Sequence, residues 1–306
     1  MSVSVNVLIP TLCTTARQAS VERAIDSALT QEGVAVTVVM VINGQRFDPA
    51  LRRSLEQHPG LRVYYQPEAD LFKARRLARD SVDADFFCWL DDDDVYLPGA
   101  LKRRVALASQ DASIDAVVSN GFIRDGSKDS LAFEDVDSIQ RDPVGTLLTR
   151  NWLCCAGGLY RTASIPSDYF DITIRSLDMT FLAFRLSLER NIVFLDEPTF
   201  RKHIGARSLS TTNAWMLPGA DVLRRMMVYP ISSRHRRMLQ HKLSRMEHEL
   251  AEYYRNSGAI SQAWTHHLSS LIRGNGLTRY ALYTRRLLAS SAARLLGKSG
   301  QSPGIG

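Results

Sequence analysis

The sequence lacks the long apolar runs and the cysteine pairs that mark several protein classes. No stretch of 18 or more apolar residues occurs, so no membrane-spanning helix is expected. Residues 1–10 carry no basic leader region, which makes a cytoplasmic location the expectation. The four cysteines (Cys13, Cys88, Cys154 and Cys155) form no CxxC pair. This excludes zinc-finger spacing and favours reduced thiols over disulfides.

Acidic residues are scarce near the C-terminus. Residues 234–298 hold 12 lysines and arginines against three glutamates, a net charge of +9, which leaves −3 for the rest of the chain from its total of +6. A basic segment of this kind indicates an anionic partner, such as a membrane surface, a lipid phosphate or a nucleic acid. Nucleic acid is the weakest of these, because aromatic residues are not interleaved with the basic ones and the preceding domain is acidic.

The first 120 residues alternate between strand-like and helix-like segments. Branched, nearly continuous apolar runs predict buried strands at 5–9, 36–42, 61–65, 86–90 and 116–118. Amphipathic spacing predicts helices at 19–31, 49–57 and 71–80, with a further helix that begins near Pro98. The pattern is typical of an α/β fold, Rossmann-like, with a mostly parallel sheet and helices on both faces. Ligands of such sheets bind beyond the carboxyl ends of the strands.

The remaining chain is mixed and then helical. We predict a loop or insertion at 124–142, a helix at 178–188, a strand at 192–195 and a mobile loop at 205–213. From residue 218 the chain reads as all-helical, with a helical hairpin over 251–271 that turns at Ser257-Gly258. The expected organisation is a domain at 1–215 (first half about 1–122, second half about 143–215), a helical region at 216–298 and a disordered tail at 299–306.

The strongest chemical signal is the run Asp91-Asp92-Asp93-Asp94 at the end of a predicted buried strand. Adjacent carboxylates repel one another unless a cation or water screens them. Oxygen ligands of this kind suit Mg²⁺ or Mn²⁺, which also bridge substrate phosphates. On a strand, Asp91 and Asp93 would share one face while Asp92 points away. The simpler structural alternative is an acidic turn or a helix cap at Asp94.

Five segments resemble family 2 glycosyltransferases, which have the GT-A fold. They occur in the family's order between residues 3 and 212: Val7-Leu8-Ile9-Pro10-Thr11, residues 23–31, residues 73–78, Leu90 to Asp94 followed by Pro98, and Phe200-Arg201-Lys202-His203 with Ser208 and Ser210. The resemblance implies an inverting, metal-dependent transfer of sugar from a nucleotide-sugar donor.

The resemblance also implies roles for individual residues. Asp178 would be the general base, and Asp93 would bind the Mn²⁺ or Mg²⁺ that bridges the diphosphate, with His203 beside the diphosphate or the metal. Asp91 would contact the donor ribose, Thr11 would line the base pocket, and Arg75 would help to hold the nucleotide. The other expected donor-binding residues are Pro10, Asn43, Asp92 and Arg201.

Two positions depart from the family pattern. The family's second strand usually ends in Val-Asp-Asn-Gly-Ser, whereas this chain has Ile42-Asn43-Gly44-Gln45, so the aspartate that reads the base is missing. The family's glutamate before the catalytic aspartate is replaced by Leu177. The nucleotide base therefore stays open, while Asp178 keeps its expected role.

Several residues have an equally simple structural interpretation. Asp178 could be a helix cap, Arg75 a solvated charge and Thr11 a hydroxyl that caps the end of a strand. We expect Trp152, Gly157 and Gly158 to contact the acceptor, since glycine permits close approach and tryptophan can stack on a sugar. The alternative for these three is a buried turn with a core aromatic residue.

Residues 280–296 read as a basic amphipathic helix that could lie on an anionic membrane. A solvated face of a packed helix is the alternative. Membrane attachment at the inner face of the plasma membrane would suit a lipid-linked glycan acceptor.

The resemblance therefore implies a glycosyltransferase that acts on a saccharide or lipid-linked glycan in bacterial surface polysaccharide synthesis. The competing hypothesis is a non-catalytic, nucleotide-sugar-binding scaffold protein with a degenerate GT-A domain. A nucleotidyltransferase ranks lower, because residues 11–20 contain no glycine for a phosphate loop.

Overall fold

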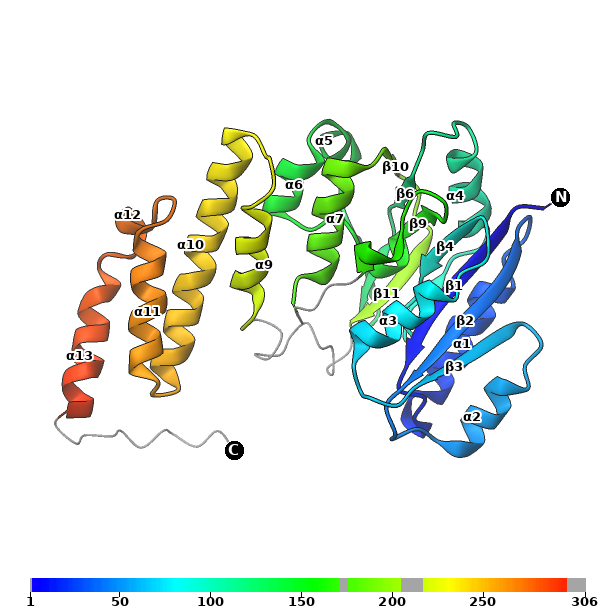
Figure 1. The fold of residues 1–306 in the computed structure, drawn as a ribbon, viewed down its shortest axis with the longest axis horizontal. Helices are drawn as coiled ribbons and strands as arrows, with labels where there is room; N and C mark the ends of the chain where they lie inside the picture. The colour runs from blue at the N-terminus through cyan, green and yellow to red at the C-terminus, as the bar shows by residue number, and fades with distance from the viewer. Residues whose placement is uncertain (1, 171–175, 205–216, 296–306) are drawn as a thin grey trace. The chain divides into compact units, whose positions relative to one another are not determined.

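The computed structural model describes residues 2–170, 176–204 and 217–295 (Figure 1). The chain divides into two compact units, residues 1–209 and residues 210–306. The boundary predicted after residue 215 stays a prediction, because residues 205–216 lie outside the described part. The predicted mobile loop at 205–213 and the predicted tail at 299–306 also lie outside it.

The first unit is built on a seven-stranded sheet of order β10-β6-β9-β4-β1-β2-β3. Every neighbouring pair is parallel except those that β9 makes with β4 and β6. The strands are β1 (Ser4–Thr11), β2 (Ala35–Asn43), β3 (Leu61–Gln66), β4 (Phe86–Trp89), β6 (Ala116–Ser119), β9 (Gly158–Arg161) and β10 (Ile192–Leu195).

Helices cover both faces of this sheet, as the direction of the crossovers requires. The chain moves outward from β1 to β3, so right-handed connections place the first two helices on one face, and the return to β4 places the third on the other (Figure 1). The helices of the unit are α1 (Gln18–Leu29), α2 (Pro49–Glu56), α3 (Leu71–Asp80), α4 (Ala100–Ala108), α5 (Val136–Arg141), α6 (Pro143–Thr149) and α7 (Asp178–Glu189). The predicted α/β class with a mostly parallel sheet is confirmed.

A second, four-stranded sheet of order β5-β11-β7-β8 lies beside the first. Its strands are β5 (Val95–Tyr96), β11 (Phe200–Ile204), β7 (Phe122–Asp125) and β8 (Lys128–Leu131). Through β5 and β11, this small sheet joins the aspartate run to the segment that carries His203.

The loop predicted at 124–142 is wrong. The segment contains the end of β7, all of β8 and α5, and Asp135 caps α5 by accepting a hydrogen bond from Ser138 N at 2.9 Å. The β7–β8 hairpin turns at Gly126, whose φ of +57° favours glycine. Hydrophobic periodicity did not reveal these strands, because each has only four residues. None of their eight side chains is buried, and five of the eight are polar.

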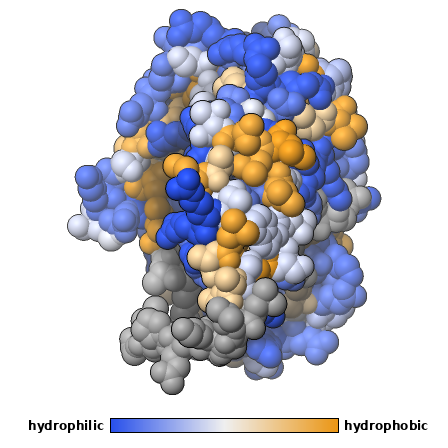
Figure 2. Space-filling model, turned by 90° about the vertical axis from the view of Figure 1, so that its left-hand side faces the viewer, coloured by the Kyte–Doolittle hydropathy of each residue, from blue (hydrophilic) through white to orange (hydrophobic). Residues whose placement is uncertain are grey.

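The second unit is helical, as predicted. It contains α9 (Gly219–Met226), α10 (Ser233–Asn256), α11 (Ile260–Leu271), α12 (Gly276–Tyr280) and α13 (Tyr283–Leu295). The predicted hairpin is the α10–α11 pair, and its turn holds Gly258 at a φ of +78°. The core joins Ala251, Ala263, Tyr283 and Leu287. Figure 2 looks onto this unit and shows apolar clusters between strongly hydrophilic side chains.

None of the helices that the structure describes is both long and apolar enough to cross a bilayer.

Candidate functional site

The predicted site residues gather at the carboxyl ends of three adjacent parallel strands. Thr11 ends β1, Asn43 ends β2, and the aspartate run begins two residues after β4. The apolar runs of these strands are buried, so the polar residues that follow emerge together at one edge of the sheet. This is the edge at which open α/β sheets bind ligands.

The aspartate run itself forms a turn, closed by a hydrogen bond of 3.0 Å from Asp94 N to Asp91 O. The predicted strand geometry is therefore wrong here, because β4 ends at Trp89. The alternation of the side chains nevertheless holds. Asp92 and Asp94 are 5% and 1% exposed, while the side chains of Asp91 and Asp93 are 32% and 48% exposed.

Asp92 is held inside the site by two partners. Thr11 Oγ1 donates to Asp92 Oδ2 at 2.6 Å, and Arg17 Nη1 forms an ion pair with Asp92 Oδ1. Burial raises the pKa of Asp92 to about 6, against the opposing effect of Thr11 and Arg17. Arg17 Nη1 also lies 3.8 Å from Asp93 Oδ2, so one guanidinium serves two carboxylates. Thr11 and Asp92 therefore act as one polar unit at the end of β1.

Asp94 connects the aspartate run to β11. His203 N donates to Asp94 Oδ1 at 2.9 Å. Burial and the neighbouring Asp91 raise the pKa of Asp94 above its usual range. Its second oxygen, Oδ2, is buried with no hydrogen-bond partner among the described residues, and the same holds for His203 Nδ1. Buried polar atoms without hydrogen-bond partners are rare, and a ligand that binds to them is one explanation for them.

Asp178 is the first residue of α7, and it does not cap that helix. The cap position is Leu177, with a φ of +51°, and it makes no capping hydrogen bond. Asp178 instead forms a buried ion pair between its Oδ2 and Arg75 Nη1, with both side chains less than a tenth exposed. Arg75 Nη2 lies 3.9 Å from Asp91 Oδ1. Arg75 thus links the expected base to the aspartate run.

Lys202 adds positive charge to the same site. Burial alone would lower its pKa, but Asp91, Cys154 and Asp94 outweigh that effect and raise it. The positive charge of Lys202 therefore persists near two carboxylates. Arg201, the next residue along β11, is held by Asp129 of the β7–β8 hairpin at 3.0 Å.

The donor atoms at this site suit a divalent cation that takes part of its coordination shell from water and substrate. Among the described residues, no group of three or more His, Cys, Asp or Glu side chains is placed to hold a metal ion. The free atoms Asp94 Oδ2 and His203 Nδ1 supply one oxygen donor and one imidazole donor. Mg²⁺ and Mn²⁺ sites commonly use one or two protein carboxylates and complete their shell with water and substrate phosphate. The residues present suit an ion of that kind rather than a protein-only cage.

Three predicted acceptor-binding residues are packed inside the domain instead. Trp152 is 1% exposed, and its indole N–H donates to Pro143 O at 2.9 Å. A Cβ on Gly157 would lie 3.2 Å from the ring of Phe200, and one on Gly158 would lie 2.2 Å from Tyr160 Oη. The chain's own aromatic rings occupy the space beside these residues, so the structure gives them packing roles and no face for an acceptor.

Asn43 and Pro10 lie at or near the carboxyl ends of β2 and β1, beside the candidate site. Asn43 Oδ1 accepts a hydrogen bond of 3.0 Å from Asp70 N, which orders the start of α3 and so helps to position Arg75. Pro10 is buried next to Thr11. The expected donor contacts of these two residues stay predictions.

Sequence reasoning gave no site role to Arg17 and assigned Asp94 only to a helix start. Arg17 lies in a short 3-10 helix (Thr15–Arg17) whose position relative to Asp92 no local pattern reveals. Asp94 was misplaced because Pro98 does not begin the helix: β5 intervenes, and α4 follows Gly99 at a φ of +70°.

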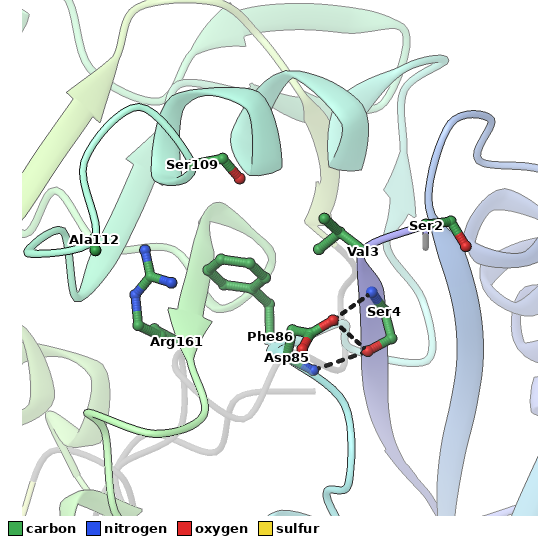
Figure 3. Close-up of a pocket in the computed structure, with 8 residues that line it drawn as sticks. All are labelled: Ser2, Val3, Ser4, Asp85, Phe86, Ser109, Ala112 and Arg161. Carbon is green, nitrogen blue, oxygen red and sulfur yellow. Dashed lines mark hydrogen bonds between the residues drawn. The ribbon is translucent and has the colours of Figure 1, made fainter.

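A cavity lies elsewhere, near the amino ends of β1 and β4 (Figure 3). It has a volume of about 620 Å³ and is lined by Ser4, Asp85 and Arg161 among others. The charged groups there are already satisfied. Asp85 accepts hydrogen bonds from Ser4 N and Oγ, and Arg161 donates to the carbonyls of Ile114 and Ala108. The cavity is therefore not a catalytic candidate.

Comparison with known proteins agrees with the fold. Residues 7–153 match the model of glycosyl transferase family 2. An uncharacterized glycosyltransferase of Rickettsia conorii is 23% identical over 63% of this chain and 34% of the relative, and one of Rickettsia felis is 25% identical over 48% and 25%. The chain thus spans about a third of the first relative and a quarter of the second.

Solved structures of S. aureus TarS share the fold. The 1–349 fragment in complex with UDP-GlcNAc superposes with a TM-score of 0.60, at 16% identity, over 84% of this chain and 75% of that one. The complex of the same fragment with UDP gives a TM-score of 0.54 at 15% identity, over 84% and 74%. With its mostly parallel sheet, its aspartate run at the strand ends and its match to the family model over residues 7–153, the chain contains a region of the glycosyl transferase family 2 type with a GT-A-like fold, followed by a helical C-terminal region.

Proposed function

We propose that this chain transfers a sugar, with inversion, from a nucleoside diphosphate sugar to a hydroxyl of a saccharide or lipid-linked glycan. The observation that carries the proposal is the Arg75 bridge, which brings Asp178 next to the aspartate run although 87 residues separate Asp91 from Asp178 in the sequence. Displacement of a diphosphate by an acceptor hydroxyl requires a base and an anion-binding group at the same site.

Asp178 is proposed as the base. As the acceptor oxygen attacks the anomeric carbon, its proton passes to the Asp178 carboxylate, and the bond from that carbon to the diphosphate oxygen breaks. The bonding electrons leave with the nucleoside diphosphate, and one displacement inverts the anomeric configuration. Because Arg75 holds Asp178 Oδ2, Oδ1 is the oxygen that takes the proton.

The carboxyl ends of β1, β2 and β4 are proposed to hold the donor. Asp91 and Asp92 would contact the nucleoside, with Thr11 in support, and Lys202 would approach the diphosphate. Asp94 Oδ2 and His203 Nδ1, which have no partner among the described residues, would contribute to a Mn²⁺ or Mg²⁺ site that, when occupied, supplies positive charge to the departing diphosphate. The expected ligand Asp93 stays a prediction, because its carboxylate lies near Arg17. TarS, solved with UDP-GlcNAc, makes a UDP-sugar the first donor to test.

A bacterial surface polysaccharide is the acceptor class that we propose. It rests on the likeness to family members and not on a contact in this structure. An acceptor linked to lipid would place the enzyme at the inner face of the plasma membrane.

Release of nucleoside diphosphate from UDP-, GDP- and dTDP-sugars, with and without Mn²⁺, tests the proposal. Asp178→Asn should slow the metal-dependent transfer by a factor of about 10² to 10⁴, the usual contribution of a general base. Asp83→Asn is the matched control, because that aspartate forms a surface ion pair with Arg62.

The competing function is a scaffold that binds nucleotide sugars. Metal-dependent donor binding without any release of nucleoside diphosphate, in the wild type and with acceptor glycans present, would support it against the enzyme. Equal rates for the wild type and Asp178→Asn would overturn the role of Asp178.

A further inference from the structure

The helical unit exposes large apolar side chains that belong to consecutive elements. Ile272, which follows α11, is 80% exposed, and Leu268 on α11 is 55% exposed. Leu277 on α12 and Leu288 on α13 are 66% and 56% exposed. Figure 2 shows apolar clusters surrounded by hydrophilic side chains on this unit. Isolated exposed leucines are ordinary, whereas several on adjoining helices indicate an interaction surface.

Helix geometry brings three of these residues together. Trp264, Leu268 and Ile272 are spaced by four residues and so form one row along α11. Trp264 Nε1 donates to Ser291 Oγ on α13 at 2.9 Å, which places the row beside α13. Leu288 lies three residues before Ser291, on the same face of α13. We call Leu268, Ile272 and Leu288 the apolar patch.

The charged residues of α11, α12 and α13 themselves are all basic. No Asp or Glu follows Glu252, whereas six arginines and Lys298 do. Arg279, Arg285 and Arg286 are exposed, and within the described residues no carboxylate forms an ion pair with any of them. Some exposed basic residues elsewhere in the chain, such as Lys73 and Arg76, do have carboxylate partners.

We propose that α11, α12 and α13 form a docking surface for an anionic lipid bilayer. Such a surface satisfies both features at once: the apolar patch leaves water for the acyl boundary, and the arginines meet lipid phosphates. A second copy of this face would bring like charges together, which disfavours self-association. The described helices would lie on the bilayer and not cross it.

Co-sedimentation of the full chain with vesicles tests the proposal. One set contains only phosphatidylcholine, and in the other about a third of the lipid is phosphatidylglycerol, which supplies the anionic charge. The chain should bind the anionic vesicles at physiological salt, bind the neutral ones much more weakly, and be released as salt rises. Binding needs no donor or acceptor sugar, so this test is independent of the proposed function.

Two variants separate the parts of the surface. Arg285→Gln with Arg286→Gln should weaken partitioning about 25-fold, on the basis of about fivefold for each arginine near an anionic surface. Leu268→Ser, Ile272→Ser and Leu288→Ser together should weaken it by about tenfold or more, because the apolar insertion is lost. Val228→Ser and Arg245→Gln are the controls. Val228 is 85% exposed but follows α9, and Arg245 is an exposed arginine that pairs with Glu249.

Circular dichroism and donor turnover in solution should be unchanged in every variant, since none of these residues touches the candidate site. The proposal is overturned if the wild type binds neither kind of vesicle, or if the patch variants bind as the wild type does. It is also overturned if the wild type self-associates and Leu268→Ser abolishes that association, because a second copy then covers the patch. Tight salt-dependent binding of RNA with no vesicle binding would reject it as well.

Discussion

Two groups of arginines, one in each unit of this protein, lie in opposite surroundings. In the first unit, Arg75 and Arg17 form ion pairs with Asp178 and Asp92 inside the candidate site. In the helical unit, Arg279, Arg285 and Arg286 are exposed and follow the last acidic residue of the chain. Buried arginines fix the geometry of carboxylates, at a cost in desolvation that only exact pairing offsets. Exposed arginines without partners hold no other side chain in place, and they are free to bind an anionic partner outside the protein.

The largest effect is expected where the buried pair is broken. Arg75→Gln leaves Asp178 and Asp91 without their shared cation and should lower the free energy of unfolding by about 3 kcal/mol, the cost of an unpaired buried charge. Transfer activity should fall with it. Chemical denaturation and initial rates measure the two effects.

Arg62→Gln is the matched control for that change, because the Arg62–Asp83 pair has side chains that are 30% and 69% exposed. Its loss should cost less than about 1 kcal/mol. If Arg75→Gln and Arg62→Gln lowered the free energy of unfolding by similar amounts, the proposed distinction between buried and surface ion pairs would be wrong.

A smaller and opposite effect on stability is expected at Asp94. Its folded-state pKa is raised, so the ionised form destabilises the metal-free protein; that penalty grows as pH rises from the unfolded-state pKa of Asp94 to the folded-state value and is complete above it. Asp94→Asn removes the charge and should raise the metal-free melting temperature at pH 8 by about 2 °C.

The same variant should lose the stabilisation that Mn²⁺ with donor gives to the wild type. Differential scanning calorimetry with and without Mn²⁺ measures both changes. A metal response that survives Asp94→Asn would show that Asp94 is no ligand.

Trp152→Phe tests packing against acceptor contact. Loss of the hydrogen bond to Pro143 should cost about 1 kcal/mol of stability. The KM for the acceptor should not change, because the indole is buried. A raised KM at unchanged kcat would restore the acceptor role that the sequence predicted.

The smallest effect is expected in the helical unit. Arg285→Gln should change the free energy of unfolding by less than about 0.5 kcal/mol, as for other exposed sites without partners. Thermal unfolding of the single variant is sufficient to measure it. A loss comparable to that of Arg75→Gln would mean that Arg285 supports the fold.

The sequence predicted the parallel sheet and the helical region because their apolar periodicity is strong. It also located the aspartate run, Asp178 and His203, which the structure brings to one edge of the sheet through Arg75 and β11. It missed the β7–β8 hairpin, whose polar strands carry no periodic signal.

The errors at Trp152, Gly157 and Gly158 have a different origin. Residue type alone cannot tell a ring that stacks on a sugar from one that fills a core, and the same glycine permits close approach by a ligand or by Phe200. Likewise, the partnership of Arg17 with Asp92 joins residues 75 positions apart, which local patterns do not encode.

The most direct test of the account is the binding of nucleoside diphosphates in the presence of Mn²⁺. Isothermal titration of the wild type and of Asp91→Asn with UDP, GDP and dTDP should show one nucleotide that binds only with the metal, with its affinity reduced about tenfold or more in the variant. If none of the three binds, or if Asp91→Asn binds as tightly as the wild type, the aspartate run is not the donor site.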